Sequence, residues 1–218
     1  MKYKHAEKGI MLILVSEIFY LIGSLPEITG SLFWSISTSV QDGINVRIDT
    51  SVGLISILFG LAALVIMIVT AVFGIIGYIN AARDEKGFRN AAICALASGV
   101  LYVAEASAQP VSSTLNTMIS ASGTIVEMFV MVFAMMGLYN LAENCGRQDL
   151  TSRGIMLLRA VIIAYVVSSL NAIIIRVFEL SSSAKIVALI TGGLDYILGV
   201  ACHILYIIYL LKTRKIWL

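Results

Sequence analysis

The sequence has 218 residues, of which 59% are hydrophobic and only 13% are charged. Ordinary soluble domains are about half apolar and about a quarter charged. The 15 basic and 13 acidic side chains are also clustered between long apolar runs, so these values argue against a soluble domain and favour a lipid bilayer as the surroundings. The net charge of +2 provides no basic field, and we expect no nucleic-acid partner.

Six stretches are long and apolar enough to cross a bilayer, which takes about 20 residues per helix because each backbone polar group must be paired within its segment. They cover residues 9–25, 53–82, 88–109, 112–142, 154–178 and 184–211. Pro26 and Pro110 directly follow the first and third stretches, where a proline can end a helix. The sequence therefore predicts an all-α polytopic membrane protein, a bundle of six transmembrane helices forming one domain over residues 1–218.

Basic residues sort unevenly between the two sides of this predicted bundle, and cytoplasmic loops of membrane proteins are enriched in Lys and Arg. The poorer side has only Arg47, Arg176 and Lys185. The richer side has Lys2, Lys4, Lys8, Arg83, Lys86, Arg89, Arg147, Arg153, Lys212, Arg214 and Lys215. We therefore expect both termini in the cytoplasm and the protein in a plasma or inner membrane.

The longest predicted loop, residues 27–52, has features of a small extracellular hairpin. Asp42-Gly43 is a hairpin turn signal, and Ile44, Val46 and Ile48 alternate with polar residues after it. A two-residue turn does not give one cleanly apolar face, however. An interfacial segment anchored by Phe33 and Trp34 and a disordered connector are the alternatives.

Small residues recur at four-residue spacing in two of the predicted helices. Ala91, Ala95 and Gly99 follow this spacing in the third stretch, and Thr70 and Gly74 in the second. Such positions let helix backbones approach closely in lipid, so we expect them at helix contacts.

Seven ionisable residues of the predicted spans are candidates for a functional role, because an isolated charge inside a bilayer costs several kcal/mol and must face the bundle interior or water. They are Glu17, Glu105, Glu127, Asp195, Arg159, Arg176 and His203. Counting about 1.5 Å per residue from each boundary places Glu127 with Arg159 in the inner layer and Glu105 with Arg176 in the outer layer. We therefore predict two structural or gating ion pairs, Glu127–Arg159 and Glu105–Arg176.

Two acids, Glu17 and Asp195, are left near the midplane with no lysine or arginine at their depth. An unpaired buried carboxylate stays protonated, binds a cation or faces water. Glu17 and Asp195 are thus the predicted ion or substrate site, with Tyr20, Thr124 and Tyr196 as nearby hydroxyls. His203 is a candidate proton relay, with a packing role as its alternative.

The sequence contains no recognisable set of catalytic residues. The three cysteines, Cys94, Cys145 and Cys202, form no CxxC pair and no zinc spacing, and we expect no metal or other cofactor. Cys202 and His203 are adjacent and point about 100° apart on a helix, so they cannot act as a nucleophile and its base. We expect a protein that is not an enzyme.

These observations favour transport of a cation or small polar solute, coupled to protons or sodium, through a polar bundle interior. A chain of this size would need to dimerise or join a larger membrane complex to enclose a path. Two alternatives stay open. The buried acids can be neutral hydrogen-bond donors that hold helices together, and the protein can be a non-transporting membrane subunit or scaffold that binds a partner protein or ligand.

Overall fold

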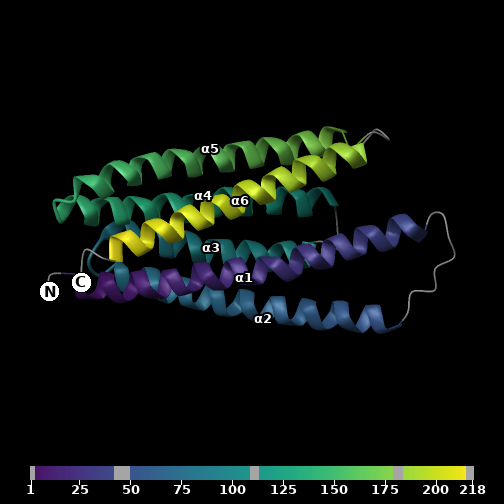
Figure 1. The fold of residues 1–218 in the computed structure, drawn as a ribbon, viewed down its shortest axis with the longest axis horizontal. Helices are drawn as coiled ribbons and strands as arrows, with labels where there is room; N and C mark the ends of the chain where they lie inside the picture. Colours follow the sequence, from purple (N-terminus) through teal and green to yellow (C-terminus); the bar gives the residue numbers. More distant parts are fainter. Residues whose placement is uncertain (1–2, 42–49, 109–112, 179–183, 215–218) are drawn as a thin grey trace.

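The computed structural model describes residues 3–41, 50–108, 113–178 and 184–214, and it describes side chains there except in 25–60, 106, 108–117 and 171–196. Six α-helices make up this part of the chain (Figure 1). They are α1 (Lys4–Gln41), α2 (Thr50–Ala81), α3 (Lys86–Ala108), α4 (Ser113–Asn144), α5 (Gln148–Phe178) and α6 (Ala184–Arg214). The predicted all-helical architecture is confirmed.

Five of these helices are long and apolar enough, within the described residues, to cross a membrane. The candidate spans are Leu61–Ala81, Lys86–Glu105, Met118–Asn144, Gln148–Leu170 and Ile197–Arg214. The described part of α1 is not apolar enough over such a length, since the charged residues Lys4, Glu7, Lys8 and Glu17 interrupt it. The fold and the hydropathy of its helices therefore define a membrane protein.

Helix α1 is longer than the sequence predicts. We expected it to end before Pro26, but it continues to Gln41, so that prediction is wrong. Proline removes one backbone donor, and a helix in a membrane tolerates this loss when neighbouring groups satisfy the freed carbonyl. The first part of the predicted outer loop, residues 27–41, is helical, whereas the predicted turn and strand at 42–48 lie outside the described residues.

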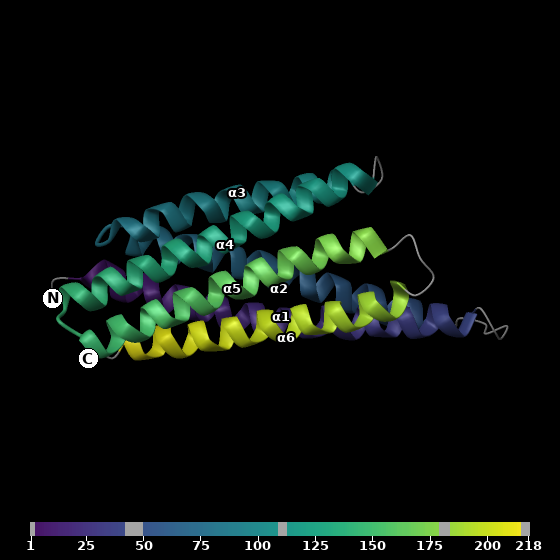
Figure 2. The same cartoon turned by 90° about the horizontal axis from the view of Figure 1, so that it is seen from above.

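All six helices have one end at the same end of the bundle, which we call the termini end. It contains Lys4, Ala81, Lys86, Asn144, Gln148 and Arg214. The helices lie close together there and diverge toward the opposite end in two perpendicular views (Figures 1 and 2). Helix α1 packs most extensively against α2, and α3 against α4, so the bundle is built from two tight hairpins with α5 and α6 beside them.

Glycine allows the backbones of both hairpins to touch near the termini end. A Cβ on Gly9 of α1 would lie 2.5 Å from the carbonyl oxygen of Gly77 on α2. A Cβ on Gly87 of α3 would lie 2.8 Å from the Cα of Gly137 on α4, which is covered by the fully buried ring of Phe88. Among the side chains that the structure describes, the buried hydrophobic core lies mainly toward this end.

The connection between α2 and α3 binds two other helices. Asp84 Oδ2 accepts a hydrogen bond of 2.7 Å from the backbone N–H of Ala6, in the first turn of α1. A carboxylate at this position satisfies a free N–H group and complements the positive end of the helix dipole. Glu85 Oε1 accepts a second bond, of 3.0 Å, from the side-chain amide of Asn140 on α4.

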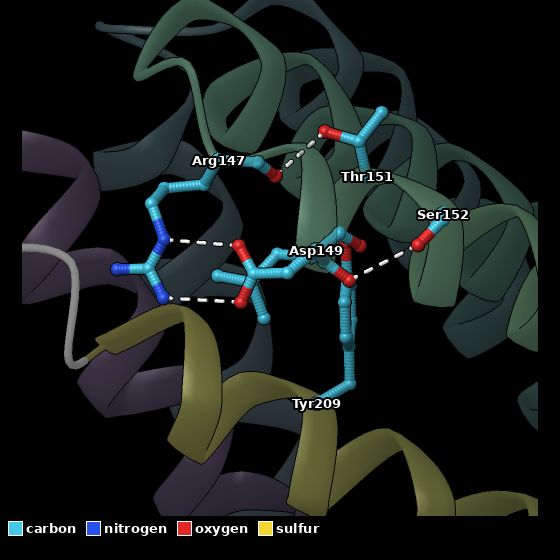
Figure 3. A network of polar contacts seen from close by, with 6 residues as sticks. Arg147, Asp149, Thr151, Ser152 and Tyr209 are labelled. Carbon is cyan, nitrogen blue, oxygen red and sulfur yellow. Dashed lines mark hydrogen bonds and ion pairs between the residues drawn. The ribbon is translucent and has the colours of Figure 1, made fainter.

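The turn between α4 and α5 is fixed by local hydrogen bonds, among them the two between Arg147 and Asp149 (Figure 3). Gly146 has a φ of 70°, and Arg147 N–H donates to the Ala142 carbonyl at 2.9 Å, the pattern that ends a helix on a left-handed glycine. Arg147 binds Asp149 through two parallel bonds of 3.0 and 3.1 Å, and these bonds raise the pKa of Arg147. Tyr209 of α6 donates to the Leu150 carbonyl at 3.2 Å, which attaches this turn to the last helix.

Candidate functional site

A cavity of about 770 Å³ lies in the bundle where the two hairpins diverge, and all six helices contribute to its wall. Most of the lining is apolar, with polar groups from several helices among it. Those that matter for charge and hydrogen bonding are Glu17, Tyr20, Ser98, Glu127, Tyr165 and His203. The volume is in the range of about 300–1,000 Å³ that small-molecule sites occupy.

The strongest polar contact of the cavity joins α1 to α6. His203 Nδ1 lies 2.6 Å from Glu17 Oε2, and the exposed fractions of the two side chains are only 13% and 11%. The ring of Tyr20 covers the imidazole at a centroid distance of 4.2 Å. Glu17 therefore has a polar partner at mid-depth, which we did not predict, because a count of lysines and arginines leaves out a histidine.

Glu127 of α4 faces the same cavity but has a weaker contact. Its side chain is exposed into the cavity, and its Oε1 accepts a hydrogen bond of 3.5 Å from Ser98 of α3. It interacts electrostatically with His203, which attracts it, and with Glu105, which repels it. Within the described side chains Glu127 forms no ion pair, so the predicted Glu127–Arg159 pair is not formed, and Arg159 is exposed instead.

Other predicted site residues lie elsewhere or outside the described side chains. The Thr124 hydroxyl donates to the Ser120 carbonyl of its own helix at 3.2 Å and does not line the cavity, so its predicted place in the site is wrong. The side chains of Asp195, Tyr196 and Arg176 lie outside the described part of the chain. The second midplane acid and the Glu105–Arg176 pair therefore stay predictions.

Two tyrosines that sequence reasoning missed lie close to the Glu17 carboxylate. Tyr78 of α2 and Tyr206 of α6 are buried, and both interact electrostatically with Glu17 and with each other. Tyr206 is fully buried, and its hydroxyl lies close enough to Tyr78 to interact with it, although the two do not reach good hydrogen-bond geometry. A hydroxyl in this position can relay a proton or hold a water molecule.

The cavity wall has two acidic groups, Glu17 and Glu127, and one imidazole, His203. A proton bound between His203 and Glu17 makes that pair neutral, whichever atom carries it. When Glu127 is ionised, it adds a negative charge that no ion pair in the described region balances, and an ionised Glu105 adds to the same field. The arrangement can hold a proton or a cation. Within the described residues no three His, Cys, Asp or Glu side chains are grouped as a metal site would require.

Comparisons with known proteins add no identification. No protein-family model matches the chain, and no curated protein or solved structure is significantly similar to it. The residues and the geometry of the cavity are therefore the basis for assigning a function.

Proposed function

We propose that the protein is a secondary transporter that moves a cation across the membrane in exchange for a proton. One observation carries this proposal: carboxylates from α1 and α4 and an imidazole from α6 share one internal cavity. Intramembrane ionisable residues that face a bundle interior are typical of ion pathways and proton relays. We assign Glu17, His203 and Glu127 as the groups that bind the proton and the cation.

Exchange follows from the charge of the site. A proton and a cation neutralise the same negative charge, so binding of one disfavours binding of the other. Glu17 Oε2 and His203 Nδ1 lie 2.6 Å apart, and a proton bound between them would be the nearest one for a cation to displace. A cation beside Glu127 is the ligand most able to displace it, because Glu127 and His203 interact electrostatically.

The buried hydroxyls suggest a route for the released proton. Glu17 lies about 20 Å along α1 from Lys4, and Tyr206 about 12 Å along α6 from Arg214, at 1.5 Å per residue. The Tyr206 and Tyr78 hydroxyls thus lie between the Glu17–His203 pair and the termini end. We propose that protons pass between the cavity and this end of the bundle through these two tyrosines and water.

We propose that all six helices span the membrane and that the termini end faces the cytoplasm, in a plasma or inner membrane. In α1 the polar side chains are buried against the other helices, as Ser16 and Glu17 show, and such a helix can cross a bilayer within a bundle. Basic residues supply the orientation, since cytoplasmic segments are enriched in them. The termini end has Lys4, Lys8, Arg83, Lys86, Arg89, Arg147, Arg153, Lys212 and Arg214.

Proton flux in proteoliposomes tests the proposal. The purified chain is reconstituted with a pH-sensitive dye inside, and sodium, potassium, tetramethylammonium and tetraphenylphosphonium are added outside in turn. We expect at least one cation to drive protein-dependent proton movement. Glu17→Gln and Glu127→Gln should each reduce that movement by about tenfold or more, because each removes a charge that binds cation or proton.

Glu143→Gln is the matched control, because Glu143 is an exposed acid at the far end of the same helix as Glu127. It should keep the flux of the unmodified protein. Asp195→Asn, measured in parallel, tests the second predicted midplane acid. Absence of flux with every cation, or flux in Glu17→Gln and Glu127→Gln equal to that of the unmodified protein, would refute the transporter proposal. Flux that appears only with a stoichiometric second protein would favour the accessory-subunit alternative.

A further inference from the structure

Helices α2 and α3 supply the largest share of the cavity wall, and the exposure of their side chains places the opening of the cavity between them. Its lining includes aliphatic side chains of both helices that are exposed on the outside of the bundle, among them Ile68 and Val72 of α2 and Val100 and Val103 of α3, with exposed fractions of 56%, 49%, 69% and 66%. A Cβ on Gly99 of α3 would have no atom within 4 Å. In a membrane this opening faces lipid, because both helices belong to the candidate spans.

The inner wall opposite this opening is polar and negative. It contains the Glu17–His203 pair, Glu127 and the rings of Tyr20 and Tyr165. Aromatic faces attract cations, and they do so more strongly where water is excluded. A ligand that reaches this wall therefore meets two carboxylates and two aromatic rings after it has passed an aliphatic rim.

Among the described side chains, one hydroxyl of this wall has no hydrogen-bond partner. It is the buried Thr70 Oγ1, which belongs to a residue that lines the cavity. Buried polar groups of folded proteins are nearly always hydrogen-bonded to protein, water or ligand. The Thr70 hydroxyl is therefore available to a ligand or a water molecule in the cavity.

We propose that the ligand is a lipophilic monocation that enters from the bilayer between α2 and α3. This inference rests on the proposed cation transport and names its substrate class. The apolar part of the ligand lies against α2 and α3, and its single positive charge lies beside Glu127 and the ring of Tyr20. The charge of the ligand balances the one carboxylate that the Glu17–His203 pair leaves without a counter-ion.

Other occupants fit less well. A hydrated inorganic ion would have to lose water along a rim that offers no charged side chain in exchange. A lipid acyl chain would fill the apolar part but leave the Glu127 charge uncompensated in a low-dielectric site. Only a ligand that combines apolar area with one positive charge satisfies both ends of the cavity.

Binding of two ions of the same shape and opposite charge tests the substrate class. Tetraphenylphosphonium and tetraphenylborate are measured by equilibrium dialysis against the full-length protein in nanodiscs, with empty nanodiscs subtracted. We expect tetraphenylphosphonium to bind at least about tenfold more tightly than tetraphenylborate. Glu127→Gln should reduce this preference by about tenfold, whereas Glu143→Gln should leave it unchanged. Equal binding of the two ions would mean that only apolar area is recognised and would overturn the proposal.

Bulky substitutions test the entrance. Val100→Phe and Gly99→Phe narrow the opening, and we expect each to slow the association of tetraphenylphosphonium by about tenfold. Ile93→Phe is the control, because Ile93 is also exposed on α3, at 59%, but does not line the cavity. A thermal melt shows whether each variant is folded. Because two positions are substituted separately, the test can still be read if one of the two variants does not fold. Unchanged association in both variants would overturn entry between α2 and α3.

The outcomes separate this inference from the proposed function. Proton movement driven by sodium or tetramethylammonium, with no binding of tetraphenylphosphonium, would refute the lipophilic substrate class and leave cation exchange intact. Binding of tetraphenylphosphonium without proton movement in proteoliposomes would support the site and refute transport. Neither binding nor proton movement would refute both.

Discussion

The two halves of the bundle contain similar helices but pack them differently. Near the termini end, Gly9, Gly77, Gly87 and Gly137 have no room for a Cβ, because each lies against the backbone or side chain of a neighbouring helix. Beyond the middle of the bundle, Gly99, Gly123 and Gly199 have no atom within 4 Å of an added Cβ, whereas Gly23 of α1 would still meet Ile66 of α2 at 2.8 Å. Among the described glycines of this half, those of α3, α4 and α6 are thus open positions, while α1 and α2 stay in contact.

The lipid environment explains why one bundle can contain both a tightly packed half and an open half. Lipid tails are as apolar as leucine, so no hydrophobic force closes a helical bundle, and helices associate only where their surfaces fit or their polar groups meet. The termini half has such fits, and its connections add the hydrogen bond that Asp84 accepts from Ala6 of α1 and the one that Tyr209 donates to the Leu150 carbonyl. At the cavity, within the described side chains, Ser16 donates to the Thr70 carbonyl between α1 and α2, and the Glu17–His203 contact joins α1 to α6. The molecule therefore combines a closed base with an open, charged site.

The largest expected effect comes from adding the same side chain to a glycine in each half. In Gly9→Val the Cβ would lie 2.5 Å from the Gly77 carbonyl oxygen and 2.6 Å from the Ala81 nitrogen, so α1 and α2 must separate. We expect a loss of about 2–3 kcal/mol and a fall of about 5–10 °C in Tm in detergent. Gly99→Val should change Tm by less than about 2 °C, because its Cβ meets nothing.

Equal Tm values for these two variants would mean that the helices are packed equally tightly around Gly9 and Gly99. A large fall in Gly99→Val would show that α3 has a close neighbour at the cavity. No fall in Gly9→Val would show that α1 and α2 are separated by more than the structure places between them.

Most of the fold could be predicted from the sequence, because each helix depends on its own hydropathy. The bounds of α2 to α6 differ from the predicted stretches by at most six residues. The end of α1 could not be predicted in this way, since whether a proline ends or merely interrupts a helix depends on neighbouring helices. The small-residue pattern of α3 was also read too simply: Ala91 is buried at a helix contact as expected, whereas Gly99 of the same series lines the cavity.

The site could be predicted in part. Glu17, Tyr20, Glu127 and His203 were all selected as polar groups at membrane depth, and the structure brings them to one cavity. Their pairing was not predictable, because rise per residue gives depth while the direction of a side chain around its helix decides its partner. Glu127 and Arg159 share a layer but do not meet. Glu17 and His203 are 186 residues apart in sequence and lie in contact.

A smaller effect is expected from Asp84, which holds the connection between α2 and α3 against the first turn of α1. Asp84→Ala removes the acceptor of the 2.7 Å bond from Ala6 N–H and should cost about 1 kcal/mol of stability, seen as a lower Tm in detergent. Glu143→Ala, which removes an exposed acid without such a bond, is the control. If both variants melt alike, the connection does not stabilise the closed half.

The smallest change in stability is expected where the two halves meet, at Tyr206. Tyr206→Phe removes a buried hydroxyl that has no hydrogen-bond partner among the described residues, so stability should stay equal or rise by up to about 1 kcal/mol. If protons leave the cavity through this hydroxyl, the same variant should slow cation-driven proton movement in proteoliposomes severalfold. Tyr209→Phe gives the opposite pattern, since its hydroxyl binds the Leu150 carbonyl: it should lower Tm and leave proton movement unchanged. A Tyr206→Phe protein that loses stability but keeps its flux would place Tyr206 in the closed half as a packing residue and not on the proton route.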